Sequence, residues 1–119
     1  MPDLNDHLTV ARRNEGFCQY LLSEDKYLDW AVTAFFYSAI HYVEAYLAKT
    51  STHSQYHRTR DSSICRDVNI RGLYDDFSDL KNDSIQARYQ GFIASRSEIT
   101  SRIKPSLEKI RNHILALIA

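Results

Sequence analysis

Glycine and proline are scarce in this chain of 119 residues, which has three glycines and two prolines. Turns in β-sheet proteins depend on these residues, so their scarcity argues against a turn-rich β-sandwich. The two cysteines are too few for the disulfide framework of a small secreted domain, and we expect both to stay reduced. Fifteen basic and fifteen acidic residues leave no net charge, which argues against a general polyanion binder but leaves room for a local basic patch.

The chain also lacks a long uninterrupted apolar run. Its longest mostly apolar stretch, 30–48, contains His41, Glu44 and several tyrosines, which a bilayer-spanning helix avoids at its centre. Residues 1–6 are polar and acidic and do not resemble a signal peptide. We therefore expect a cytoplasmic protein without membrane contact, in which residues 1–119 form a single domain.

Apolar residues at helical spacing predict an all-α fold. The first stripe predicts a helix that ends near Leu22, with Asp3 or Asp6 as its N-cap. Residues 26–49 are apolar around most of the helical circumference, which is typical of a helix buried by neighbours on several sides. We expect this segment, with Trp30 among its buried residues, to form the central helix of the fold.

Three further helices are predicted after a polar loop at 50–55. A short one covers 56–68, and a longer one covers 70–87 with Asn69 as a candidate cap. A capping box at 95–98 begins the last helix, in which Pro105 should produce a kink. The expected architecture is an antiparallel bundle of four to five helices.

The central helix carries the first candidate site. Tyr37, His41 and Glu44 follow one another at steps of four and three residues and therefore share one face. A histidine one turn from a carboxylate can form an oriented pair for acid–base chemistry. A buried histidine that is simply hydrogen-bonded to its neighbours would show the same pattern.

The second candidate site follows the central helix, where two histidines and two arginines occur within residues 53–60. Arg58 and Arg60 can hold a phosphate or carboxylate, and His57, with His53 nearby, can donate or accept a proton. Loops that a rigid scaffold holds are frequent functional sites. A solvated loop whose side chains cap neighbouring helices is the alternative interpretation.

The third candidate site is Arg88 with Tyr89, which precede the last helix. An arginine beside an exposed aromatic ring can bind a ligand, although a basic residue at the end of a helix can equally cap its free carbonyl groups.

A metal centre is not predicted. His53 and His57 share a helical face, but a zinc site needs three or four ligands, and neither cysteine belongs to a CxxC pair. We therefore expect neither a metal nor another cofactor.

Residues 29–47, which read DWAVTAFFYSAIHYVEAYL, resemble the second helix of HEPN domains, and the likeness continues loosely through His57-Arg58, Arg88-Tyr89 and the final helix. The resemblance implies a small helical bundle that is usually a homodimer. Many members of that family are metal-independent RNases in toxin–antitoxin, CRISPR-associated or phage-defence systems. Others are non-catalytic and bind nucleotides, RNA or proteins, and some pair with a small nucleotidyltransferase.

The chain departs from the catalytic pattern of that family, in which an arginine precedes a histidine by four to six intervening residues. The nearest forward match, Arg111 to His113, has one intervening residue, and His53 and Arg58 have the right spacing in the reverse order. The family's RNase residues therefore cannot be transferred to this chain.

Three functions remain. The first is a non-catalytic module that binds a nucleotide, RNA or a protein. The second is a divergent metal-independent RNase, of the kind that acts as a toxin in a toxin–antitoxin system, that uses His57, Arg58 and Arg60. The third is a plain helical interaction protein. The missing motif and the neutral charge favour the first.

Overall fold

Helix α2 lies at the centre of an all-helical structure. The computed structural model describes residues 2–50, 57–91 and 94–119, and at 57 and 58 it describes only the backbone. The elements in chain order are α1 (Leu4–Glu24), α2 (Leu28–Lys49), α3 (His57–Arg66), the 3-10 turn η1 (Arg71–Leu73), α4 (Tyr74–Tyr89), α5 (Arg96–Glu98), the π-helical segment η2 (Ile99–Ile103) and α6 (Lys104–Ile118). No strand occurs in these described ranges, so the predicted all-α bundle is confirmed.

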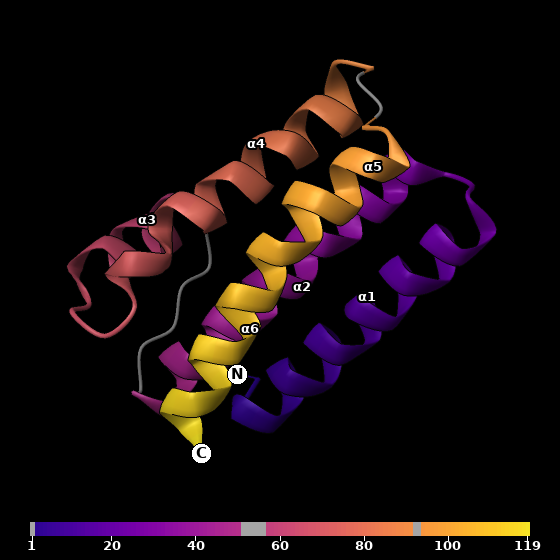
Figure 1. Ribbon diagram of the computed structural model, residues 1–119. Coiled ribbons are helices and arrows are strands. Elements are labelled where there is room, and N and C mark those ends of the chain that lie inside the picture. Colours follow the sequence, from indigo (N-terminus) through magenta and orange to yellow (C-terminus); the bar gives the residue numbers. More distant parts are fainter. Residues whose placement is uncertain (1, 51–56, 92–93) are drawn as a thin grey trace.

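The long helices surround α2 on three sides (Figure 1). Helix α1 returns antiparallel along one side, and its packing is principally against α2. Helices α4 and α6 pack against α2 and against each other, with α6 lying in front of α2 in this view. Helix α2 is therefore the element that every other long helix contacts.

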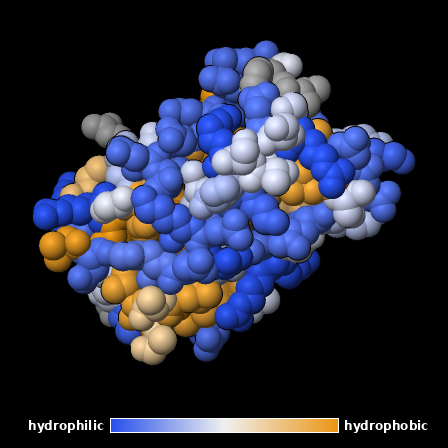
Figure 2. All heavy atoms as spheres, viewed as in Figure 1, coloured by the Kyte–Doolittle hydropathy of each residue, from blue (hydrophilic) through white to orange (hydrophobic). Residues whose placement is uncertain are grey.

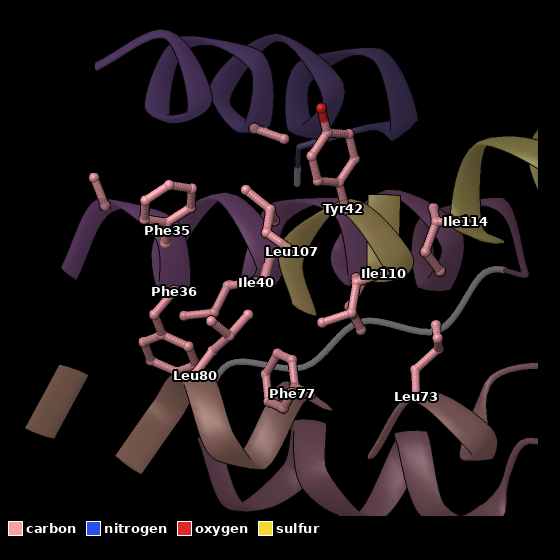
Figure 3. Close-up of a cluster of buried hydrophobic side chains, with 14 of the residues drawn as sticks. Phe35, Phe36, Ile40, Tyr42, Leu73, Phe77, Leu80, Leu107, Ile110 and Ile114 are labelled. Carbon is pink, nitrogen blue, oxygen red and sulfur yellow. The ribbon is translucent and has the colours of Figure 1, made fainter. Parts of the chain in front are cut away.

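The apolar core fills the space between α2, α4 and α6 (Figure 3). The predicted stripes are confirmed, since the following residues are all at most 3% exposed: Phe35, Phe36, Leu73, Phe77, Leu80, Ile99, Ile103, Leu107, Ile110 and Ile114. Trp30 was expected in the same core, but its residue is 56% exposed. The prediction failed there because Trp30 borders open clefts toward α4 and α1, and an apolar pattern cannot tell such a position from a buried one.

The turn between α1 and α2 lies slightly later than predicted. Asp25 takes a left-handed conformation and its N–H donates to the carbonyl groups of Leu21 and Leu22, so α1 continues to Glu24. Tyr27 is also left-handed, with φ of 53°, and α2 therefore begins at Leu28 rather than near residue 26. Two left-handed residues other than glycine in one short turn reverse the chain within a few positions.

The ends of the first and last helices follow the predicted capping patterns. Asp3 caps α1 and forms a reciprocal capping box with Asp6, and Ser95 forms another with Glu98. Pro105 lacks an N–H group and crowds the preceding turn. The helix accommodates it through the π-helical segment η2, so the predicted irregularity takes the form of a widened turn.

Asn69 does not cap the following helix, contrary to the prediction. Its side-chain amide donates to the hydroxyl of Tyr46 at 3.2 Å, while its backbone N–H donates to the carboxylate of Asp67 at 2.8 Å. The chain then passes through η1, and α4 begins at Tyr74. A tertiary partner on α2 thus competes successfully for a side chain that could have capped a helix locally.

The face that carries α6 is predominantly hydrophilic, with an apolar area near the C-terminus (Figure 2). None of the described helices is long and apolar enough to cross a lipid bilayer.

Candidate functional site

Tyr37, His41 and Glu44 succeed one another along α2, as their spacing predicts, but the structure gives each a different partner. Tyr37 meets Arg88 of α4, His41 meets His7 of α1, and Glu44 meets α3. The three residues therefore contact three different helices instead of converging on one catalytic constellation.

Glu44 and Arg60 form a buried ion pair. The Nε atom of Arg60 lies 2.7 Å from a carboxylate oxygen of Glu44, and the side chains are 10% and 6% exposed, respectively. Burying either charge alone is costly, so each side chain holds the other in the interior. This pair joins α3 to α2 and engages the guanidinium group that the second candidate site would present to a phosphate.

His41 forms a histidine pair with His7. Their Nδ1 atoms are 3.0 Å apart and their ring centroids 5.3 Å apart, which joins α1 to α2. A cavity of about 370 Å³ borders both rings and is lined by Pro2, Asp6, His7, Val10 and His41. Burial lowers the pKa of His41, and the nearby positive charges of His7 and Arg60 lower it further against the opposing effect of Glu44. His41 is therefore neutral near pH 7.

Arg88 lies at the C-terminal end of α4, between two tyrosine rings. Its guanidinium carbon is 5.8 Å from the ring centroid of Tyr37 and 5.0 Å from that of Tyr89, distances at which cation–π attraction acts. It also donates to the hydroxyl of Tyr37 and to the carbonyl of Ser84, both at 3.3 Å. The second bond goes to a carbonyl group inside α4 and not to one of the free carbonyl groups at its end, so it is not the helix-capping role that the sequence left open. The two rings supply features suited to ligand binding.

A cleft of about 280 Å³ opens beside Arg88. Its lining comes from the first turns of α2 and the last turn of α4: Asp29, Trp30, Thr33, Ala87, Arg88 and Tyr89. Two large rings border it while remaining accessible to solvent, since Trp30 is 56% and Tyr89 is 74% exposed. No carboxylate of the described residues lies within ion-pair distance of Arg88.

A second hollow adjoins this cleft on the α1 side. It is smaller, about 200 Å³, and shares Trp30 and Thr33 with the first, while Asn14, Phe17 and Tyr37 complete its lining together with Ala34. Phe17 is 46% exposed. Exposed aromatic rings therefore border both sides of the first turns of α2.

Part of the second candidate site lies outside the described residues. This applies to His53 and to the side chains of His57 and Arg58, although the backbones of the last two begin α3. Within the described ranges, no group of three or more His, Cys, Asp and Glu side chains is arranged to hold a metal ion.

Sequence reasoning missed Trp30, Asp29 and His7 as site residues. A single tryptophan near the start of an apolar helix fits a core position. Nothing in the sequence of α1 indicates that His7 faces His41. The one signal for Trp30 is its position directly after the charged Asp29 in the first turn of α2.

The fold and these clefts define a helical bundle with an arginine–aromatic cleft at one end of its central helix. Comparisons with protein-family models, curated proteins and solved structures found no match to this chain.

Proposed function

We propose that this protein is a non-catalytic binding module, and that the cleft of Trp30, Arg88 and Tyr89 holds a nucleotide or an unpaired RNA base. Arg88 carries the proposal, because its guanidinium group has two aromatic neighbours and no carboxylate partner among the described residues. A guanidinium group without a carboxylate partner is suited to binding a phosphate.

The rings beside Arg88 supply the second half of the recognition. Unpaired bases stack on exposed aromatic side chains, and each stacked base contributes about 1–3 kcal/mol. Trp30 of α2 and Tyr89 of α4 both offer such surfaces to a cleft of about 280 Å³. Asp29, in the same cleft, adds a hydrogen-bond acceptor for a ribose hydroxyl or a base amino group.

Trp30 is the only tryptophan in the chain, so its fluorescence reports directly on the cleft. Titration with nucleoside monophosphates and short single-stranded RNA should quench this fluorescence as a base stacks on the indole ring. Arg88→Gln should weaken binding at least tenfold, since it removes the charge and keeps a polar side chain of similar length.

Arg71→Gln is the matched control for that variant. Arg71 is exposed, whereas Arg88 is partly buried, and Arg71 lies in η1, before the opposite end of α4. Equal affinities of the wild type, Arg88→Gln and Arg71→Gln, or the absence of quenching by any nucleotide or RNA, would overturn the proposal. A labelled RNA followed by anisotropy extends the test to Trp30→Ala, which removes the stacking surface, and Trp30→Phe, which retains one.

The divergent RNase is the competing function, and it concerns the other end of α2. It requires His57, Arg58 and Arg60 to face a substrate, whereas Arg60 is paired with buried Glu44. RNA incubated with the protein in EDTA, beside a His57→Ala/Arg58→Ala variant, separates the two functions. Cleavage that disappears in the variant supports the RNase, and binding without cleavage supports the module.

The resemblance to HEPN domains supports the wider parts of the proposal: a cytoplasmic homodimer in a toxin–antitoxin or defence system, with a nucleotidyltransferase as a candidate partner protein. Light scattering after size-exclusion chromatography tests the dimer, and a nucleotidyltransferase gene beside this one tests the partner. A monomer at all concentrations would overturn the dimer but leave the cleft proposal in place.

A further inference from the structure

The cleft of Arg88 is the first of three hollows that run from α4 across the start of α2 and along α1, which lies beside α2 (Figure 1). The hollow of about 200 Å³ on the α1 side shares Trp30 and Thr33 with the first. A third hollow, of about 430 Å³, shares Asn14 and Phe17 with the second. Each hollow therefore adjoins the next, and we call the whole run the α1–α2 groove.

An arginine lies at each end of this groove. Arg88 borders the first hollow, and Arg13, an exposed residue of α1, borders the third. No carboxylate of the described residues lies within ion-pair distance of either guanidinium group. Among the described residues that line the groove, Asp29 at the Arg88 end is the sole carboxylate. Both ends of the groove are therefore suited to a phosphate.

Aromatic rings lie between the two arginines. Trp30 borders the first and second hollows, and Phe17 borders the second and third. The two residues are 56% and 46% exposed, so each leaves a ring surface open to a ligand. Proteins that bind single-stranded nucleic acid combine cationic groups along the backbone with aromatic rings on which successive bases stack. The groove contains both kinds of group, with the rings between the charges.

The groove is longer than one nucleotide. Trp30 and Tyr37 both line the second hollow, and they lie about 10 Å apart along α2 at a rise of about 1.5 Å per residue. Successive nucleotides of a stacked strand are about 3.4 Å apart along its axis, so the second hollow alone spans about three such steps. A mononucleotide held beside Arg88 leaves most of the groove to the nucleotides that follow it.

We propose that the α1–α2 groove binds a single-stranded oligonucleotide, of which about two to three consecutive nucleotides contact the protein. One base stacks on Trp30 beside Arg88, the next lies against Phe17, and Arg13 contacts a phosphate beyond it. This inference rests on the proposed function and extends that site along α1. It makes a short strand, and not a free mononucleotide, the preferred ligand.

The test measures how affinity depends on ligand length, through the quenching of Trp30 fluorescence by AMP, the dinucleotide pApA and the trinucleotide pApApA. The dinucleotide should bind about tenfold or more tightly than AMP, because a second base stacks in the groove. Phe17→Ala should remove most of this gain, whereas Phe17→Tyr, which keeps a ring, should retain it. The deoxy forms of the two longer ligands are titrated beside them, and the tighter-binding form identifies RNA or DNA as the ligand.

Arg13→Gln tests the far end of the groove. It should weaken the binding of pApApA and reduce the salt dependence of log Kd by about 0.7, the value for one phosphate contact on a single strand. Arg12→Gln and Tyr20→Ala are the matched controls, since both residues are exposed on α1 and line none of the three hollows. Both control variants should bind all three ligands like the wild type.

The proposal is overturned if pApA binds no more tightly than AMP, or if Phe17→Ala keeps the full gain. Light scattering tests whether a second copy of this chain occupies the groove instead. A dimer that Phe17→Ala dissociates without any change in oligonucleotide binding would also overturn the proposal. If AMP binds and longer ligands gain nothing, the groove fails and the proposed function stands. If AMP and every oligonucleotide leave the fluorescence unchanged, both fail.

Discussion

The two sides of α2 differ in kind, although one helix supplies both. Toward α4 and α6, α2 presents Phe36 and Ile40 to a closed apolar core (Figure 3). Along the side that Tyr37 and His41 occupy, it is bordered by hollows and partly exposed rings. The first side stabilises the fold by removing apolar surface from water, and the second side does so through individual polar contacts.

This difference separates stability from function within one helix. The closed side tolerates little change of volume because protein interiors are tightly packed. The open side can exchange side chains at small cost in stability, and it is the side on which the proposed ligand sites lie. A substitution on the closed side should therefore lower the stability with little effect on binding, and a matched substitution on the open side should do the reverse.

Phe77→Ala should have the largest effect on stability. Phe77 is 1% exposed and its ring centroid is 5.6 Å from that of Phe36, so truncation leaves a cavity and costs about 3–5 kcal/mol. Phe17→Ala is the matched change on the open side, where the residue is 46% exposed, and it should cost less than about 1 kcal/mol. Urea unfolding measures both, and equal losses would contradict the distinction between the two sides.

Arg60→Ala should come next, at about 3 kcal/mol, because it leaves the carboxylate of Glu44 buried without this cation. Lys81→Ala removes one partner of a more exposed ion pair with Asp61 and should cost less than about 1 kcal/mol. The measurement is again the free energy of unfolding in urea. If Arg60→Ala proves as mild as Lys81→Ala, Arg60 is available to a substrate and the RNase becomes the better proposal.

Tyr42→Phe should have a smaller effect, of about 1 kcal/mol. The hydroxyl of Tyr42 donates to Glu15 of α1 at 2.8 Å, and Glu15 also pairs with Arg111 of α6. The substitution removes one hydrogen bond but leaves Glu15 its cation. A double-mutant cycle with Glu15→Gln would show whether the three groups act as a network, and strictly additive losses would show that they do not.

The smallest effect concerns pH. The pKa of His41 is lowered in the folded protein, so the unfolded chain binds more protons once the pH falls below the ordinary histidine value of about 6.5. The contribution of this group is fully present above that pH and declines as the pH falls through the folded pKa. His41→Gln should flatten the dependence of the urea midpoint on pH between 7.5 and 5.5, and an unchanged dependence in this variant would contradict the prediction.

Much of the fold could be predicted because its rules are local. Helical spacing located the buried residues of α4 and α6, and short acceptor side chains located the N-cap of α1 and the capping box at Ser95. The failures arose where a distant partner decided the outcome. Asn69 bonds to Tyr46 instead of capping a helix, and Trp30 lies beside open clefts instead of in the core.

The candidate site was predictable only in parts. The sequence pointed to Tyr37, His41, Glu44, Arg88 and Tyr89 as notable residues, but it could not show that Tyr37 meets Arg88 across 51 positions of the chain. It also grouped His41 with Glu44, whereas the structure pairs His41 with His7, 34 positions away. Such pairings depend on how the helices pack and not on the spacing within one helix.

The sequence by itself determined that this chain forms helices, where most of them end, and which of their faces lie in the core. Those features follow from backbone hydrogen bonding and the burial of apolar stripes, which act over a few residues. Only the tertiary structure decided which polar side chains meet: Glu44 with Arg60, His41 with His7, and Arg88 with Tyr37. The relative position and rotation of neighbouring helices set these meetings, and both depend on the packing of the whole core.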